Sequence, residues 1–185
     1  MRFQLLALLA LASASASAAN QWAGMENLPD GAYSGVNHAD GSTTMTSLST
    51  GEAYTFALTS TPGTPQTRRS SRDGISKRDT SCWGYELDHG GVDQGVAALK
   101  NWAGAGHDLV SDDARSYYGF NNKGVYYYYC INAYHTQGNL DMGDIDYANR
   151  MMDANCGGYQ AGFFRWPGSP ELVGKCRSGT AVCLG

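Results

Sequence analysis

The chain has 185 residues, of which 42% are hydrophobic and only 16% are charged. This balance is typical of a small globular protein, and it excludes an intrinsically disordered chain and a polytopic membrane protein. The formal net charge of −4 at neutral pH argues against a nucleic-acid-binding surface. We therefore expect neither a nucleic acid nor a membrane as a partner.

The N-terminus has the features of a secretory signal peptide. Arg2 precedes a continuous apolar run over residues 5–12, and small side chains follow from residue 13 to residue 19. The run is shorter than the roughly 20 residues that a membrane-spanning helix needs, whereas it fits the hydrophobic region of a signal peptide. We expect residues 1–19 to be removed and the rest to be secreted to the extracellular space. Translocation into host cells is left open.

Residues 20–78 read as a propeptide that ends in a linker. Residues 42–48 and 53–58 are strand-forming, and residues 60–78 are rich in proline, serine, threonine and basic side chains. Within this linker Lys77-Arg78 precedes Asp79, which resembles a site for a kexin-type protease. We expect cleavage after Arg78; an uncut flexible linker is the alternative.

The propeptide has two interpretations. It either covers the mature domain until release, for example by pairing with a free sheet edge, or serves as a spacer. In the first case the uncut precursor is expected to be the less active form. All five cysteines lie after Arg78, so we divide the chain into a signal peptide (1–19), a propeptide (20–78) and a mature cysteine-containing domain (79–185).

The mature domain begins with a predicted helix. Val92, Val96 and Leu99 recur at the i, i+4 and i+7 spacing of one helical face, and glycines follow at residues 104 and 106. Residues 124–134 then read GVYYYYCINAY, a β-branched and aromatic run typical of a central strand covered on both faces.

A second helix is predicted over residues 143–155, and further strands over 160–166, 172–177 and 181–184. These elements predict an α+β fold, a small disulfide-stabilised sandwich with two helices packed on a mostly antiparallel sheet.

The cysteine positions lead to a disulfide prediction. Cys82 opens the mature domain and Cys183 nearly closes it, so we expect a bridge that ties the two ends together. Cys156 ends a helix and Cys176 lies on a following strand, and we expect these two to pair. Cys130, in the tyrosine-rich strand, is expected to be a free thiol packed as a small hydrophobe.

Catalytic and metal-binding motifs are not found. The sequence contains no GxSxG, HExxH, P-loop or CxxC pattern. The acidic residues at positions 141, 144 and 146 lack the spacing of a calcium loop, and we expect them to cap and solvate a helix. Glu86, Asp88 and His89 are expected to form a turn and a helix cap. We therefore predict a protein that is not an enzyme and has no cofactor or metal, with a secreted hydrolase as a third-ranked alternative.

Four aromatic residues are candidate binding residues. Tyr117 and Tyr118 are predicted to lie in a polar loop rich in asparagine and glycine, and Tyr159 and Trp166 flank glycine-rich turns. Exposed rings beside amides and acids suit stacking on sugar faces or anchoring a protein interface. The alternative is that they fill the ends of the domain.

Residues 138–176 carry a resemblance to known families. The segments GNLDMGDID, NCGGYQAGFFRW and SPELVGKC are similar to parts of fungal glycan-binding and necrosis-inducing secreted effector domains. The signal peptide, the dibasic pro-segment and the short cysteine-containing domain also resemble those of fungal small secreted effectors. The resemblance implies a secreted fungal domain of similar fold, and no family binding residue is carried over.

Two functions follow from these features. The first is a non-enzymatic fungal virulence effector that acts on host tissue or immunity through a host protein. The alternative is a lectin-like or antimicrobial protein that binds microbial or cell-wall glycans.

Overall fold

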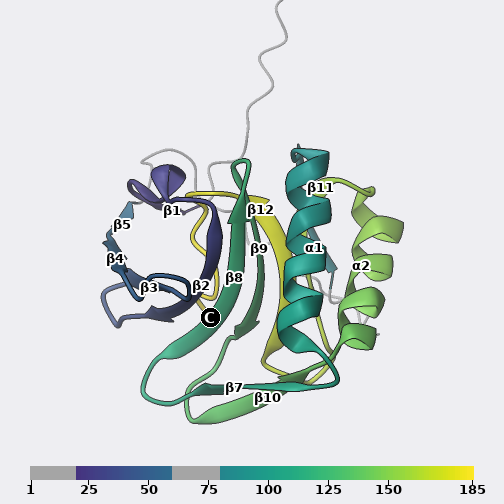
Figure 1. Cartoon of the computed structure of the whole chain (residues 1–185). Coiled ribbons are helices and arrows are strands. Elements are labelled where there is room, and N and C mark those ends of the chain that lie inside the picture. The colour runs from purple at the N-terminus through teal and green to yellow at the C-terminus, as the bar shows by residue number, and fades with distance from the viewer. Residues whose placement is uncertain (1–19, 60–79) are drawn as a thin grey trace, which may run out of the picture.

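The computed structural model describes residues 20–59 and 80–185. Its main feature is an eight-stranded sheet in the order β4-β3-β2-β8-β9-β12-β11-β6, in which all neighbouring strands are antiparallel. The two helices lie together on one side of this sheet (Figure 1).

The described N-terminal part contains β1 (Gln21–Trp22), the short 3-10 helix η1 (Met25–Asn27), β2 (Gly31–Asn37), β3 (Thr43–Ser47), β4 (Ala53–Phe56) and β5 (Leu58–Thr59). The rest of the chain forms β6 (Thr80–Glu86), α1 (His89–Ala103), β7 (His107–Ser111), β8 (Arg115–Asn122), β9 (Val125–Ile131), β10 (Thr136–Leu140), α2 (Met142–Cys156), β11 (Gln160–Arg165) and β12 (Glu171–Arg177).

Strand β9 lies in the interior of the sheet and is buried along its whole length. Its side chains alternate between two hydrophobic cores, one on each face of the sheet. Tyr126, Tyr128 and Cys130 belong to one core, whereas Tyr127 and Tyr129 belong to the other. The prediction of a central strand covered on both faces is therefore confirmed.

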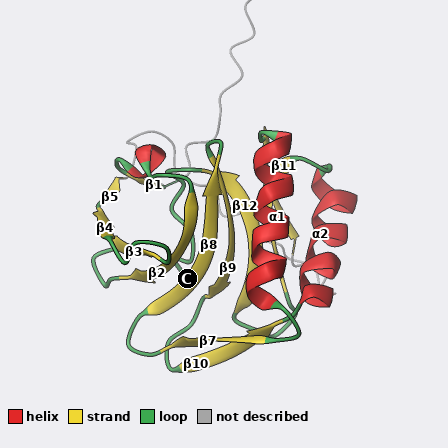
Figure 2. Cartoon of the chain, viewed as in Figure 1, coloured by secondary structure: helices red, strands yellow, loops and turns green. Residues whose placement is uncertain are grey.

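Helices α1 and α2 cover one of these faces (Figure 2). Leu99 of α1 and Ile145 and Met152 of α2 are fully buried against the tyrosines of β9. Gly95 allows α1 to approach closely, because a Cβ at this position would lie 2.5 Å from Cβ of Tyr127. Both predicted helices are confirmed: α1 begins at His89 after its N-cap Asp88, and α2 begins one residue earlier than predicted.

The N-terminal part of the chain and the C-terminal tail cover the opposite face. Trp22, Met25 and Met45 are fully buried there, together with Val182 and Cys183 of the tail. Strand β2 pairs with β8 along its entire length, from Gly31↔Asn121 to Asn37↔Arg115. Residues 20–59 thus contribute three strands to the main sheet, and the strands predicted near residues 42–48 and 53–58 are confirmed. Cleavage after Arg78 stays a prediction, since Lys77 and Arg78 lie outside the described residues.

The fold class agrees with the sequence in its main features: two helices pack on a mostly antiparallel sheet that carries two disulfides. A sandwich is not confirmed, because the described strands form one large sheet and two two-stranded pieces. The predicted strand at 181–184 is wrong, and these residues form an irregular tail.

The disulfide prediction is also wrong. Cys82 pairs with Cys156, Cys130 pairs with Cys183, and Cys176 is free and buried. Cys82 lies on β6 at the edge of the main sheet, next to α2, whereas Cys183 lies beside the central strands. Cys176 belongs to the core on the face opposite the helices, so the sheet separates it from Cys156 at the end of α2.

We predict that peptide mapping without reduction will recover the Cys82–Cys156 and Cys130–Cys183 links. Burial raises the pKa of the Cys176 thiol well above its usual range, so an alkylating reagent at neutral pH should label this residue only after unfolding. A peptide containing Cys176 in a disulfide would contradict this pattern of links.

The double change Cys130→Ser with Cys183→Ser should lower the free energy of unfolding by about 2–4 kcal/mol.

Candidate functional site

Two of the four candidate aromatic residues are not available to a ligand. Tyr117 and Tyr118 lie on β8 rather than in a loop, and both are buried. The ring of Tyr117 stacks on Trp22 at a centroid distance of 5.7 Å, and that of Tyr118 stacks on Trp102 at 4.2 Å. Their assignment as binding residues is therefore corrected: β8 is paired on both edges and packed on both faces, so these two rings belong to the cores.

Trp166, in contrast, lines a surface groove of about 320 Å³. The ring is half-buried, and its edge-to-face contact with Phe164 holds the two ring centroids 5.2 Å apart. The segment Trp166-Pro-Gly-Ser169 forms a turn closed by a hydrogen bond from Ser169 N to Trp166 O, with Gly168 at φ +75°. Proline followed by glycine at the two central positions is the signature of a type II turn, which fixes Trp166 beside Ser169.

Glu171 lies in the groove with both carboxylate oxygens engaged. Tyr129 donates its hydroxyl hydrogen to Oε2 at 2.8 Å, and Ser169 donates to Oε1 at 3.2 Å. Burial and the nearby Glu171 raise the pKa of Tyr129 well above its usual range, so its hydroxyl remains a donor. Gly138 leaves room for this pair, because a Cβ there would lie 2.2 Å from the Tyr129 hydroxyl oxygen.

Asp144 and Asn139 complete the lining of the groove. Asp144 belongs to the capping box of α2, since it accepts from the backbone N of Asp141 at 3.3 Å and its own N donates to Asp141 Oδ1 at 2.8 Å. Asn139 is exposed on β10 and donates to Asp108. The groove thus combines one aromatic ring with two carboxylates, one amide and one hydroxyl whose positions are set by the fold.

A second hollow, of about 210 Å³, lies where α1, α2 and β12 meet. Lys175 reaches into it from β12 with a side chain that is only 1% exposed. Its Nζ donates to Asp153 Oδ1 at 3.0 Å and to the backbone oxygen of Gly158 at 2.6 Å. Asn149, also on α2, accepts a hydrogen bond from the hydroxyl of Tyr127 at 2.6 Å.

Tyr159 lines this second hollow rather than the Trp166 groove. Its ring stacks on His89 at a centroid distance of 3.7 Å, so one ring face is already covered. His89 also contacts Glu86 at 2.8 Å, and Asp88 caps α1 by accepting from the backbone N of Gly91. The predicted helix cap is confirmed at Asp88, whereas Glu86 ends strand β6 and His89 is the first residue of α1 rather than part of a turn.

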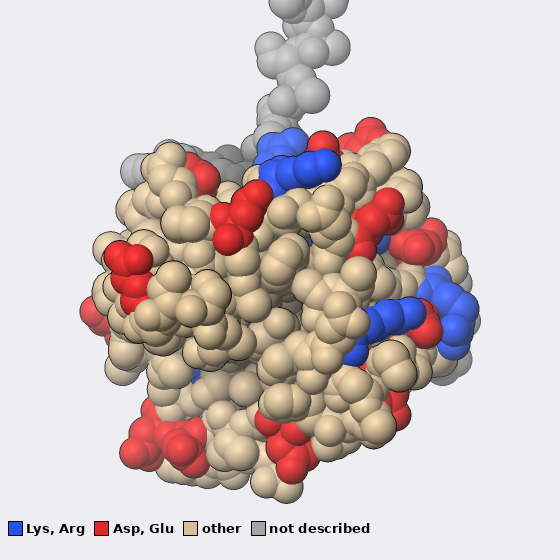
Figure 3. All heavy atoms as spheres, viewed as in Figure 1, with Lys and Arg blue, Asp and Glu red and all other residues tan. Residues whose placement is uncertain are grey.

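On the face in Figure 3, the lysine, arginine, aspartate and glutamate side chains of the described residues are scattered rather than gathered in one patch. Among residues 20–59 and 80–185, no cluster of three or more His, Cys, Asp or Glu side chains is arranged to hold a metal ion. No helix in this described part combines the length and the apolar character needed to cross a membrane.

Of the residues that line this groove, sequence reasoning named only Trp166 as a binding candidate. Ser169 and Glu171 follow Trp166 within five residues, whereas Asn139 and Asp144 come from β10 and α2 and carry no local signal that places them here. Lys175 was missed as well, since a single lysine in a strand does not indicate a buried side chain.

Comparisons with known proteins give no family for this chain. No family model, no curated protein and no solved structure matches it.

We predict that Asp153→Asn will lower the free energy of unfolding by about 1–3 kcal/mol, because Lys175 would remain buried without its charged partner. The matched control is Asp146→Asn, which removes the more exposed ion pair with Lys100 and should cost less than about 1 kcal/mol. Urea unfolding followed by tryptophan fluorescence measures both variants. An equal decrease in the free energy of unfolding for the two variants would show that the pair with the buried Lys175 contributes no more than the exposed pair.

Proposed function

We propose that this protein is a secreted binding protein that recognises a glycan in the groove around Trp166. The observation that supports it is the composition of this groove, in which one half-buried indole stands beside two carboxylates, an amide and a hydroxyl. The C–H faces of a sugar pack well against an aromatic ring, and sugar hydroxyls pair with carboxylate and amide oxygens.

The fixed positions of the polar groups support binding rather than catalysis. Glu171 accepts hydrogen bonds on both oxygens, and Asp144 is held in a helix cap. A general acid or base must exchange a proton with the substrate, which a carboxylate committed to structural hydrogen bonds does poorly. The same commitments favour a binding site, because groups that are already ordered lose little entropy when a ligand arrives.

The remaining features support a role outside the cell. The signal-peptide-like N-terminus and the two disulfides fit a secreted protein in an oxidising compartment.

A glycan array that includes fungal and plant cell-wall oligosaccharides tests the proposal, followed by calorimetry on any hit. Trp166→Ala should weaken binding by roughly tenfold or more, because the stacking surface is lost. Asn139→Ala should weaken it by about fivefold, the cost of one hydrogen bond.

Gln137→Ala is the matched control, since this exposed residue lies on the same strand as Asn139 but outside the groove. Near-ultraviolet circular dichroism verifies that Trp166→Ala remains folded. An array without a reproducible hit, or hits that survive both groove changes, would show that the groove is not a glycan site.

A virulence effector is the second candidate, supported by the resemblance to fungal secreted effectors. Deletion of the gene should then reduce infection, and the purified protein should elicit a host response. If Trp166→Ala abolishes glycan binding but leaves the host response unchanged, the effector acts through another surface and a host protein.

A further inference from the structure

The N-terminal part of the chain has no covalent bond to the rest apart from the linker. All five cysteines lie beyond residue 78, and both disulfides join residues within 80–185. A cut at the proposed processing site, Lys77-Arg78, would therefore leave residues 20–59 attached by non-covalent contacts alone. What happens to the segment depends on the strength of these contacts.

Backbone pairing joins residues 20–59 (the segment) to residues 80–185 (the body) at two places. Strand β2 forms a seven-residue antiparallel ladder with β8. Near β1, Trp22 N donates to Gly179 O at 2.8 Å, and Ala181 N donates to Asn20 O at 2.9 Å. Loss of the segment would turn β8 into a free edge with unpaired backbone groups, and it would remove the contacts that hold the C-terminal tail.

Large apolar side chains of the segment fill the core on this face of the sheet. Trp22, Met25, Tyr33 and Met45 are at most 2% exposed, and they share a core with Tyr117 and its neighbours on β8 and β9. Without the segment, these tyrosines would face water across a broad apolar surface, which monomeric secreted proteins rarely leave uncovered.

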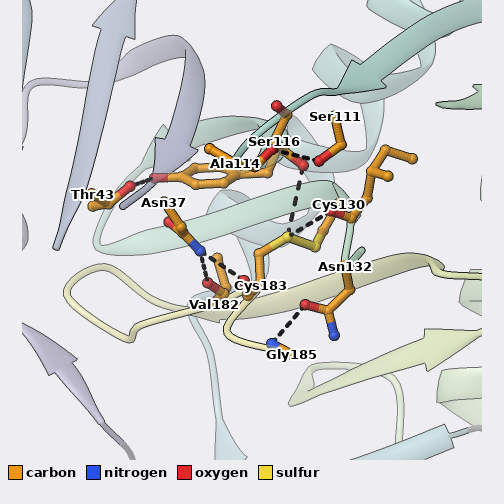
Figure 4. The surroundings of a disulfide bond; sticks show 12 residues. Asn37, Thr43, Ser111, Ala114, Ser116, Cys130, Asn132, Val182, Cys183 and Gly185 are labelled. Carbon is orange, nitrogen blue, oxygen red and sulfur yellow. Dashed lines mark hydrogen bonds between the residues drawn. A yellow bond between two sulfur atoms is a disulfide. The ribbon is translucent and has the colours of Figure 1, made fainter. Parts of the chain in front are cut away.

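Buried polar groups fit the segment to the body. Asn37 donates to the backbone oxygens of Val182 and Cys183 at 2.9 and 2.7 Å, next to the Cys130–Cys183 disulfide (Figure 4). From the body, Asn121 donates to Leu28 O at 2.7 Å. Separation of the two parts would break these bonds and return the groups to water, so each bond makes a modest net contribution to the assembly and fixes its geometry.

The fit also extends to shape. Gly35 lies opposite Tyr117 in the β2–β8 register, and a Cβ at this position would come within 2.0 Å of Cζ of the ring. Thr43, on the next strand, lies 2.5 Å from the hydroxyl of the same tyrosine. Gly35 and Thr43 of the segment therefore pack directly against the ring and the hydroxyl of Tyr117 in the body.

We infer that residues 20–59 are a permanent structural subunit rather than a cap that is released. Cleavage of the linker converts the protein into a two-chain assembly in which the N-terminal chain keeps its place in the sheet. Removal of the N-terminal chain would therefore unfold part of the body instead of unmasking a finished domain.

The test is to cut the purified full chain and measure whether the two pieces separate. Lys77-Arg78 is replaced by the recognition sequence of a specific protease, which makes the cut certain, and the wild-type chain treated with a kexin-type protease runs beside it. A non-reducing denaturing gel should show two fragments, while native mass spectrometry and gel filtration should show one species with the mass of both. A C-terminal fragment that elutes alone in native buffer would overturn the inference.

Trp22→Ala sharpens the test. After the cut, the dissociation constant of the two-chain assembly should be roughly a hundredfold or more higher in this variant than in the wild type, because a fully buried indole is lost. Leu48→Ala is the matched control from the same segment, since Leu48 is 52% exposed, and its assembly should dissociate like the wild type. Equal dissociation of the two variants would also overturn the inference. The uncut Trp22→Ala chain serves as the reference for folding.

Discussion

The arrangement depends on one constraint, the burial of β9 on both faces. A strand whose seven residues all lie in the interior needs a cover above and below. The helices provide the cover on one side, and the N-terminal segment with the C-terminal tail provides it on the other. Because residues 80–185 supply both helices but only a short tail for the second face, the cover on that face depends mainly on residues 20–59.

The tyrosines of the central strand also connect the interior with the two polar hollows. On the helix face, the hydroxyl of Tyr127 reaches Asn149 and that of Tyr129 reaches Glu171. Each ring is buried in the core while its hydroxyl meets a polar group that lines a hollow. One buried strand therefore contributes to the fold and positions polar groups in the walls of two surface hollows. On the opposite face, three further tyrosine rings lie across glycines of neighbouring strands, at Gly35, Gly119 and Gly174.

Local sequence patterns predicted much of the fold because each depends on residues that are close together in the chain. The helical spacing of Val92, Val96 and Leu99 identified α1, and the unbroken aromatic run identified β9 as a central strand. The helix caps at Asp88 and Asp141 have local signals as well. Trp166 was named as a candidate for the same reason, since the glycine-containing turn that follows it is a local feature. By contrast, Tyr117 and Tyr118 were placed in a polar loop because asparagine and glycine surround them, whereas pairing with β2 and β9 makes this segment an interior strand.

The sequence by itself determined the positions of both helices and of five strands (β3, β4, β9, β11 and β12), the burial of the tyrosine run, and the lack of cysteines before residue 79. Only the tertiary structure decided which cysteines pair, because pairing requires two side chains on the same face of the sheet, and the strand order sets that face. It also decided that Asn139, Asp144 and Glu171 meet beside Trp166, and that Lys175 is buried between the helices. These outcomes depend on contacts between residues distant in the chain, which no local pattern encodes.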